Sequence, residues 1–518
     1  MPSCLEASAS PDVRAHEPLK SIAILGGGTA GWMAASILAR ALPGAKCTIT
    51  VIESPQIGTV GVGEATIPPI IELLRFLAIN EDDFVRHTQS TYKLGIKFTD
   101  WRALGHSYWH PFGTFGEMIN LRPFYHSWQR AKAGGVPVKL NDFSLCATLG
   151  DQGKFRFPEN SPNGPVAGLR YALHFDAALV AKYLRIYSER LGVTCLERTV
   201  AAATQRADGF IDELVFTDDT RLLADLYIDC SGFGGVLIEK ALQTGYLDWR
   251  SLLPCDRAVA VQTELISARP PHTESFARSA GWRWRIPLQH RNGNGYVYSS
   301  AHTSDEQAHN DLLAAIGERT LTDPRVLRFV TGRRKLFWNR NCVALGLASG
   351  FLEPLESTSI HLVMSGMYKL LEYFPDRSFN QHGIDSYNAE SIYEMERIRD
   401  FIILHYCLTQ RSDTPLWRYC QNMPLPDSLS QRIDLYRATG RIRHQVGDLF
   451  TDLSWFYILE GMGVEPERYD PLIDVVKFDQ LKEILGSIAR AVAAAAKSAP
   501  SHDGYFLRDM DKAGTAAR

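Results

Sequence analysis

The feature that most constrains this chain is a glycine-rich turn between a short apolar strand and a helix near the N-terminus. Residues 21–25 predict a buried strand, and Gly26-x-Gly28-x-x-Gly31 follows directly and opens an apolar helix. The next predicted strand, residues 47–52, ends at Glu53. The glycines let a pyrophosphate approach the helix N-terminus, and Glu53 can accept a hydrogen bond from a ribose hydroxyl. This unit predicts a dinucleotide site and leaves FAD and NAD both open.

Composition excludes several classes of protein. The 518 residues are 45% hydrophobic and 22% charged, as in a globular protein, and a net charge of −3 gives no case for binding nucleic acid or an anionic membrane. No signal peptide and no apolar run of about 20 residues is found. The nine cysteines are scattered without a Cys-x-x-Cys pair, which favours reduced thiols over disulfides or a zinc site. We therefore expect a cytoplasmic protein without a metal.

The order of predicted elements indicates an α/β fold that is α+β in part. The first strand–turn–helix unit belongs to a Rossmann-like region, and later strands and helices form separate runs. The expected divisions are 1–18 as a disordered leader, 19–255 as the nucleotide-binding domain with an irregular insertion around 114–165, 256–340 as an antiparallel sheet region, 341–375 as a return to the nucleotide site, 376–497 as a helical substrate-binding region and 498–518 as a flexible tail.

A second stretch that is poor core material lies far from the first glycine turn. An apolar strand, residues 341–348, runs into Ser349 and Gly350 and then into the segment from Phe351 to Ile360, which carries Glu353, Glu356, Ser357 and Thr358. Small residues followed by Ser and Thr before an apolar helix predict a helix N-terminus after a tight turn. Such an end suits an anion or the edge of a flavin ring. The alternative is an ordinary turn in which Ser357 and Thr358 only cap the helix.

Three further segments admit both a structural and a functional interpretation. Lys93 and Lys97 share one face of a predicted strand, where two solvated lysines are the usual explanation. The aromatic turn 108–113 could fill a loop or form a wall for a flat substrate. Trp282 and Trp284 fall on one face of a strand, either in a sheet core or beside a flavin.

In chain order, these motifs resemble those of the flavin-dependent tryptophan halogenases, and the resemblance runs from about residue 20 to about residue 475. The motifs that carry it are Gly26-x-Gly28-x-x-Gly31, Gly61-Val62-Gly63-Glu64-Ala65-Thr66, Lys93, Trp282-x-Trp284-x-Ile286-Pro287 and Glu353-Pro354-Leu355-Glu356-Ser357-Thr358. The resemblance implies the two-dinucleotide FAD-binding fold of flavin monooxygenases. It also implies reduced FAD (FADH2) from a separate flavin reductase, which with O2 converts chloride or bromide into hypohalous acid that halogenates an electron-rich aromatic.

The resemblance assigns roles to individual residues. Lys93 and Glu356 would be catalytic, with Ser357 orienting the lysine and Glu356 accepting the proton that the ring loses. Trp282 and Trp284 would shield the flavin from the substrate. FAD contacts would come from Gly26, Gly28, Thr29, Ala30, Gly31, Glu53, Ala65, Val200, Leu347 and Ile360. His110 and Phe112 would sandwich the substrate ring, and Thr358 with the backbone N–H of Ser359 would bind halide.

The chain departs from the family pattern in two respects. The family often has glycine where Ser359 stands, and serine resists a positive φ, which bears on the halide geometry. Members that continue as Ser-Thr-Ser-Ile-His-Leu often act on free indole and favour bromide. The residues that clamp the amino and carboxyl groups of tryptophan are not found, so a small indole is expected over the amino acid.

Two other functions stay open from the sequence, and one assembly is expected. A flavin-dependent aromatic hydroxylase (monooxygenase) could use the same scaffold, although such enzymes usually have Gly-Asp where this chain has Gly346-Leu347. A flavin-binding protein without turnover is the third hypothesis. Homodimers are frequent in the family, so one is a possible assembly here.

Overall fold

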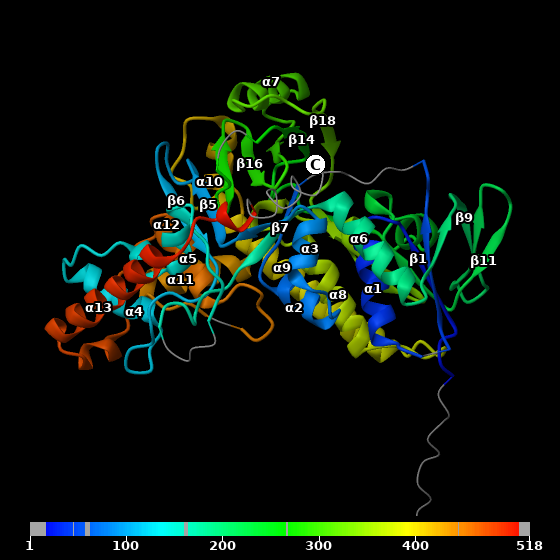
Figure 1. The fold of residues 1–518 in the computed structure, drawn as a ribbon, viewed down its shortest axis with the longest axis horizontal. Coiled ribbons are helices and arrows are strands. Elements are labelled where there is room, and N and C mark those ends of the chain that lie inside the picture. The colour runs from blue at the N-terminus through cyan, green and yellow to red at the C-terminus, as the bar shows by residue number, and fades with distance from the viewer. Residues whose placement is uncertain are drawn as a thin grey trace, which may run out of the picture.

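The structure, a computed structural model, describes residues 17–44, 46–56, 63–159, 164–265, 268–443 and 445–506. Almost all of the expected leader, the last part of the expected tail, and Gly61 and Val62 of the second glycine turn lie outside these ranges. Figure 1 shows the nucleotide-binding region on the right and the helical region on the left, with an antiparallel sheet above them.

The first glycine turn follows β1, a central strand of a mainly parallel sheet with the order β20-β21-β12-β1-β2-β8. Helix α1 (Thr29–Ala41) follows the turn and packs against α6 (Ala177–Arg190) and α8 (Ser359–Glu372). This arrangement is the dinucleotide-binding fold that the sequence predicts. The strands are β1 (Ser21–Leu25), β2 (Thr48–Glu53), β8 (Thr194–Glu197), β12 (Leu226–Asp229), β20 (Trp338–Asn339) and β21 (Cys342–Ala344).

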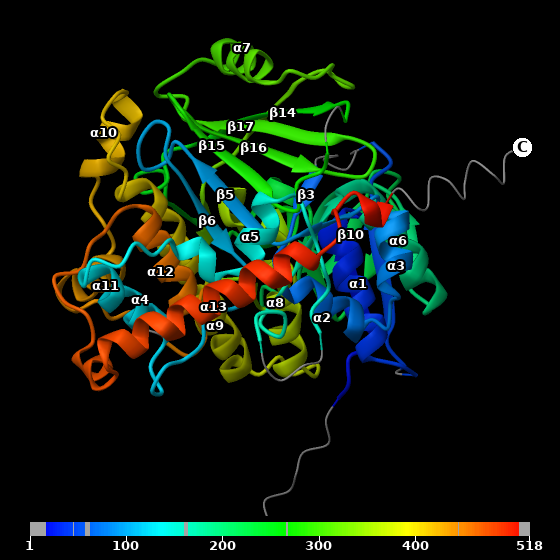
Figure 2. The ribbon, with the colours of Figure 1, turned by 60° about the vertical axis from the view of Figure 1, so that its left-hand side comes forward.

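A second sheet has the order β18-β14-β17-β16-β15-β5-β6 and is seen in the upper half of Figure 2, above most of the helices. Two of its strands come from the N-terminal part of the chain, because β5 pairs in parallel with β15. The sheet therefore links the tryptophan strand β16 to the segment that follows Lys93. Its strands are β5 (Gly95–Thr99), β6 (Ser107–Pro111), β14 (Arg257–Thr263), β15 (Thr273–Arg278), β16 (Gly281–Pro287), β17 (Asn292–Tyr298) and β18 (Arg325–Arg328).

Helices dominate after residue 359, as the sequence predicts. The longest, α9 (Gln381–Cys407), is buried without interruption from Ile398 to Tyr406, and α12 (Asp452–Gly461) packs on β6. The others are α10 (Pro415–Asn422), α11 (Asp427–Thr439), α12 (Asp452–Gly461) and α13 (Phe478–Ser498).

The expectation that residues 114–165 are irregular is wrong for much of the segment. Helix α4 (Phe124–Ala133) and helix α5 (Leu145–Asp151) occupy it, joined by the short turn η1 (Leu140–Phe143). The side chain of Ser144 caps α5 by accepting from Ala147 N. Pro123 and Gly134 lie at the two ends of α4, so there these residues mark the boundaries of a helix and not disorder.

The remaining elements complete the nucleotide-binding half and its border. The helices are α2 (Pro69–Phe76), α3 (Glu81–His87) and α7 (Asp305–Ala315), and the short 3-10 and π turns are η2 (Gly232–Gly234), η3 (Val236–Ala241), η4 (Gly346–Ala348), η5 (Pro354–Glu356) and η6 (Pro471–Val475). The strands are β3 (Gly63–Ala65), β4 (Thr91–Lys93), β7 (Ala172–Asp176), β9 (Val200–Gln205), β10 (Ile211–Phe216), β11 (Arg221–Leu223), β13 (Tyr246–Asp248), β19 (Gly332–Arg334) and β22 (Gly350–Phe351).

Lys93 and Lys97 do not share a face, contrary to the expectation from alternation. Lys93 belongs to β4, which pairs with β7, whereas Lys97 belongs to β5 in the second sheet. Lys93 is fully buried, and Lys97 is half-buried with its Nζ 2.6 Å from Asp151 Oδ1. The break between β4 and β5 at Leu94 changes the direction in which the two side chains point.

The first part of the expected flexible tail is packed, which corrects that prediction for residues 499–506. His502 is fully buried, and its Nε2 accepts from the backbone N–H of Tyr92, the residue before Lys93, at 3.2 Å. His502 Nδ1 lies 2.8 Å from Arg269 O, and Tyr92 stacks on Phe155 beneath this segment. Buried aromatic surface therefore holds a stretch whose sequence is polar.

We expect His502→Ala to lower the free energy of unfolding by about 1–3 kcal/mol, because the buried Tyr92 N–H loses its acceptor. Chemical denaturation followed by circular dichroism measures this change. The exposed His382, at the start of α9, is the control, and His382→Ala should stay within about 0.5 kcal/mol of the wild type. Equal stability of the two variants would contradict a packed role for residues 499–506.

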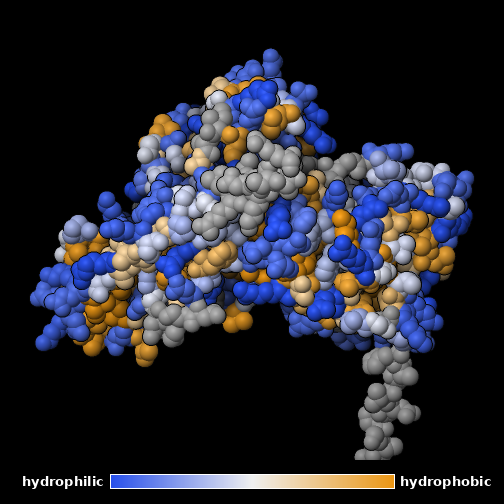
Figure 3. Space-filling view, viewed as in Figure 1, coloured by the Kyte–Doolittle hydropathy of each residue, from blue (hydrophilic) through white to orange (hydrophobic). Residues whose placement is uncertain are grey.

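In the described part of the chain, no helix combines the length and apolarity that crossing a membrane requires. The face in Figure 3 mixes hydrophilic and hydrophobic residues, with the latter in small groups.

Candidate active site

A cavity of about 450 Å³ lies where the first glycine turn, the tryptophan strand β16 and the segment 346–360 meet. Nearly all of the residues predicted to contact the nucleotide or flavin line it, namely Gly26, Gly28, Thr29, Ala30, Glu53, Ala65, Val200, Trp282, Trp284, Leu347 and Ile360. Gly31 does not line the cavity. A Cβ there would meet Gly26 O at 1.8 Å, so this glycine permits close packing within the turn instead.

The wall at the N-terminus of α1 fits the diphosphate part of a dinucleotide. Gly28 is the N-cap residue, and a Cβ placed on it would meet nothing within 4 Å. The first turn of α1 has no acidic residue and no side-chain cap, so its N–H groups are free for an anion. Glu53 ends β2 at the same cavity, with Arg185 Nη1 3.3 Å from its carboxylate. The pattern of donors and one acid suits pyrophosphate and ribose.

The other end of the cavity is apolar and aromatic. Trp282 and Trp284 both line it, with ring centroids 6.1 Å apart. Gly295 on the neighbouring strand β17 makes room for Trp284, because a Cβ there would lie 2.0 Å from that ring. The Nε1 of Trp282 donates to Glu353 Oε2 at 2.8 Å. Two large rings thus narrow the end of the cavity that suits a flat cofactor ring.

Lys93 reaches the same region from β4. Its Nζ donates to Ser357 Oγ at 2.8 Å and to Thr66 O at 2.9 Å, and it lies 5.2 Å from the centre of the Phe112 ring. Burial lowers the pKa of Lys93 to about 7, although the nearby Glu356 carboxylate acts in the opposite direction. A buried lysine with this pKa is unlike the solvated lysine that the sequence alone favours, and it is typical of a functional group.

The turn that carries Ser357 has one residue in the left-handed conformation. That residue is not Ser359, which stands where the family often has glycine. Ser357 has φ +59° and ψ +38°, while Ser359 is the first residue of α8. The concern that serine at 359 would resist a positive φ is therefore wrong, since the helical conformation there suits any residue. Thr358 is the N-cap residue of α8 and is buried, and its side chain makes no cap hydrogen bond.

Glu356 points away from the cavity and lies between two histidines. Its Oε2 is 2.7 Å from His110 Nδ1, and its Oε1 is 2.9 Å from His405 Nε2. Burial would raise the pKa of Glu356, but the two histidines outweigh it and lower the pKa to about 2. Glu356 is therefore held as a carboxylate deep inside the protein.

Aromatic side chains surround His110 and Glu356. The His110 ring lies 5.4 Å from the Phe401 ring and 5.8 Å from the Phe450 ring, and those two phenylalanines stack at 3.9 Å. Trp455 meets Phe401 edge-on at 5.2 Å. Hence Lys93, Ser357, Glu356, His110 and Phe112, which come from separate parts of the chain, lie together beside an aromatic cluster.

Sequence reasoning missed His405 and Tyr406, which contact this site, and included Tyr108 only as part of the aromatic turn 108–113. His405 and Tyr406 follow the apolar run Phe401–Leu404 inside a helix, and all six residues are almost completely buried. Two polar residues at the end of such a run are the only signal that could have identified them.

Comparison with known proteins shows which family the chain belongs to. The profile of the family described as "Tryptophan halogenase" matches residues 21–477. Tryptophan 7-halogenase RebH of Lentzea aerocolonigenes is 34% identical, over 95% of this chain and 99% of its own length. Tryptophan 6-halogenase SttH of Streptomyces toxytricini is 34% identical, over 87% of this chain and 91% of its own length.

Solved structures agree in fold over nearly the whole length. The flavin-dependent halogenase BrvH of Brevundimonas sp. BAL3 superposes with a TM-score of 0.91 at 42% identity, covering 95% of this chain and 99% of that one. Xcc4156 of Xanthomonas campestris, also a flavin-dependent halogenase, gives 0.91 at 43% identity, covering 95% and 98%. This chain therefore belongs to the tryptophan halogenase family and is an enzyme of the flavin-dependent, FADH2-using type.

Proposed function

We propose that this enzyme halogenates an indole ring with hypohalous acid, using Lys93 and Glu356 on the substrate side of the flavin cavity. The observation that carries the proposal is the buried Lys93 ammonium bound to Ser357, a residue that lines the cavity, while the adjacent Glu356 faces the other way. One short turn thus separates the place where an oxidant can form from the place where a ring can be held.

When bound, reduced FAD from a separate flavin reductase would activate O2, the oxidant of the reaction, so that halide can be oxidised to hypohalous acid. The chain's part at this step is to exclude the organic substrate. Trp282 and Trp284 occupy the ring end of the cavity, where a hydroxylase would need to place its substrate. Their position supports halogenation over the hydroxylase alternative.

Thr358 and the N–H of Ser359 are proposed to bind the halide. They begin α8, whose first turn carries no acidic residue, and Ser359 lines the cavity. Uncapped N–H groups and the positive end of the helix dipole favour an anion here.

Lys93 is proposed to receive the oxidant and hold it against the substrate. Its donors to Ser357 and Thr66 fix the direction of the Nζ atom. With a pKa of about 7, the group exists as ammonium and amine in comparable amounts near neutral pH, so it can donate a hydrogen bond to the oxidant or form a haloamine with it. Glu356, as a carboxylate, would then accept the proton released by the ring.

The substrate is proposed to be an indole. The flat, apolar surroundings of His110, Phe112 and Phe450 suit an aromatic ring. The tryptophan 7- and 6-halogenases among the relatives favour tryptophan itself. Free indole is favoured by the charged residues beside the aromatic cluster, which are already paired with one another.

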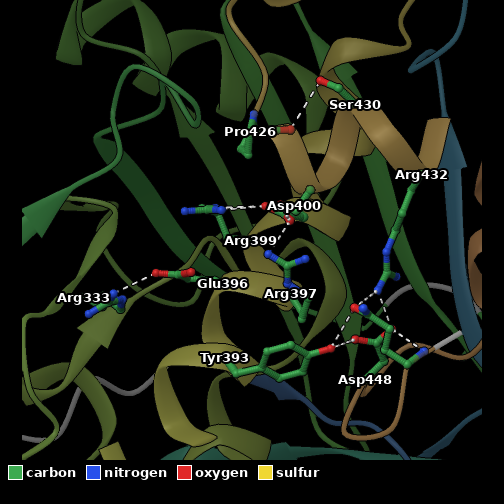
Figure 4. A network of polar contacts seen from close by, with 12 residues as sticks. Arg333, Tyr393, Glu396, Arg397, Arg399, Asp400, Pro426, Ser430, Arg432 and Asp448 are labelled. Atoms are coloured by element: carbon green, nitrogen blue, oxygen red, sulfur yellow. Dashed lines mark hydrogen bonds and ion pairs between the residues drawn. The ribbon is translucent and has the colours of Figure 1, made fainter. Parts of the chain in front are cut away.

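Figure 4 shows these pairs. Arg432 Nη2 lies 2.5 Å from Asp448 Oδ2, and Tyr393 OH donates to Asp448 at 3.0 Å. Arg397 and Arg399 lie 3.1 and 2.8 Å from the Asp400 carboxylate. The ammonium and carboxylate of tryptophan would have to break such a pair and desolvate it, which costs more than placing a bare indole.

The test supplies a flavin reductase, NADH, FAD and O2, with bromide or chloride, to indole and tryptophan in parallel. Mass spectrometry should show the halogen isotope pattern in a product that requires halide. We expect kcat/KM for indole to exceed that for tryptophan at least about tenfold, equivalent to ~1.4 kcal/mol. A hydroxylated product that does not require halide would support the hydroxylase, and a preference for tryptophan would overturn the substrate assignment alone.

A further inference from the structure

Two consecutive residues of α9 contact the two acids of the Glu353-Pro354-Leu355-Glu356 turn. His405 reaches Glu356 and Tyr406 reaches Glu353. Because neighbouring residues of a helix project about 100° apart, the two side chains point in different directions and each can reach a different acid. One acid lies on the substrate side and the other behind the tryptophan wall of the flavin cavity.

On the flavin side, Glu353 connects Tyr406 to Trp282. Glu353 is fully buried, and its Oε2 accepts from Trp282 Nε1 at 2.8 Å and from Tyr406 OH at 2.5 Å. Its Oε1 has no hydrogen-bond partner among the described residues. Burial raises the pKa of Glu353 to about 7, against the effect of the two donors. The orientation of the Trp282 ring thus depends on a carboxyl group that Tyr406 holds.

On the substrate side, His405 faces Glu356. His405 Nε2 and Glu356 Oε1 are 2.9 Å apart, at ion-pair distance, and within the described chain neither atom makes a hydrogen bond. His405 Nδ1 lies 2.9 Å from Tyr108 OH. When that hydroxyl donates to Nδ1, Nε2 carries the proton and lies beside the carboxylate. Phe98 stacks on both rings, at 4.6 Å from His405 and 5.0 Å from Tyr108, which fixes the imidazole plane.

The helix that presents this pair is rigid at this point. Residues 398–406 are buried without interruption, and Tyr406 packs between the rings of Trp101, at 5.2 Å, and Trp417, at 6.0 Å. Close packing of this kind leaves the two side chains few alternative rotamers. A displacement of this turn would move both acids together.

We propose that His405 and Tyr406 are positioning residues for the reaction, His405 for the Glu356 carboxylate and Tyr406, through Glu353, for the Trp282 ring. The inference rests on the proposed function. It adds that helix α9 fixes the position of Glu353 on the flavin side relative to Glu356 on the substrate side. It predicts separate defects for the two residues, because each acts through a different acid.

The charged and titratable groups facing Glu356 are His110 from β6, His405 from α9, Lys93 from β4 and, more remotely, Tyr108 from β6. Removing His405 leaves the other three in place. The remaining Glu356 carboxylate then has one donor fewer in the same buried surroundings, so its pKa must rise. A base with a raised pKa loses activity as the pH falls, at a higher pH than before.

The first experiment measures kcat for halogenation of indole between pH 4.5 and 8.5 in the wild type, His405→Leu and His405→Gln. Because the pKa of Glu356 is held at about 2, the wild type should lose no kcat through protonation of this carboxylate in that range, whereas in His405→Leu the raised pKa should make kcat fall further at the acid end of the range than at pH 8. The glutamine retains an N–H donor of similar reach, and this variant should recover most of the wild-type profile. A uniform loss at every pH in both variants would show a merely structural role and overturn the proposal for His405.

The second experiment measures coupling, defined as halogenated product formed per O2 consumed, in Tyr406→Phe. Loosening Glu353 should free the Trp282 ring, so coupling should fall at least about threefold, with hydrogen peroxide accounting for the difference, and tryptophan fluorescence should shift. The pH dependence of kcat should stay that of the wild type. Tyr387→Phe, which removes another buried hydroxyl from α9 away from both acids, is the matched control and should keep wild-type coupling.

The outcomes separate the two levels of the argument. If the wild type halogenates indole and Tyr406→Phe couples as well as Tyr387→Phe, the inference about Tyr406 is wrong and the proposed function stands. If the folded, FAD-binding wild type makes no halogenated product from any indole, the proposed function is wrong, and the positioning roles are withdrawn with it.

Discussion

Lys93→Ala is expected to abolish halogenation, lowering kcat at least about a thousandfold, while reoxidation of bound reduced flavin continues near the wild-type rate. The ammonium lies outside the nucleotide-binding part of the cavity and contacts Ser357 and Thr66, so its loss should leave the flavin chemistry intact. The oxidant would form and then find no group to hold it beside the ring. Stopped-flow absorbance follows the flavin, and mass spectrometry follows the product.

Lys97 is a matched control for this variant. It lies four residues further along the chain, on β5, and pairs with Asp151 at the surface. Lys97→Ala should keep kcat within about twofold of the wild type, because a surface ion pair contributes little. Substantial halogenation by Lys93→Ala would show that the lysine has no part in the chemistry.

Glu356→Gln is expected to lower kcat by about 10²–10⁴-fold with little change in the KM for indole, the range typical for loss of a general base. The amide keeps the shape of the side chain, so the ring should still bind beside His110. It cannot accept the proton from the halogenated ring, and it also weakens the interaction with His405 Nε2, 2.9 Å from Oε1. Steady-state kinetics at saturating bromide separate the effect on kcat from the effect on KM.

Glu394 provides the control for removing a buried carboxylate. It lies on α9 and, like Glu356, has a pKa held at about 2 against burial and a histidine partner, His361, at 2.9 Å. Glu394→Gln should lose stability but retain kcat within about twofold once folded. Near-normal turnover by Glu356→Gln would remove the base role, and an equal loss in Glu394→Gln would point to stability rather than chemistry.

The local motifs of the sequence were enough to predict several parts of the fold. The strand–glycine–helix unit at residues 21–41, the acid Glu53 and the helices after residue 376 form as predicted, because each depends on neighbours within a few turns of chain. The expectation that the insertion at 114–165 is irregular is wrong, since helices α4 and α5 lie in it and Pro123 and Gly134 mark only the ends of α4. The proline and glycine content of this segment gave no sign of the two helices that form in it.

The site divides in the same way. The sequence by itself determined the dinucleotide turn, the paired tryptophans of β16 and, through resemblance, the family and the candidate pair Lys93 and Glu356. Only the tertiary structure decided that Lys93 is buried rather than solvated and that Glu356 lies between His110 and His405. The burial and the pKa of Lys93 and Glu356 depend on residues brought together from β4, β6, η5 and α9. The sequence of one segment does not show which distant segment will pack against it.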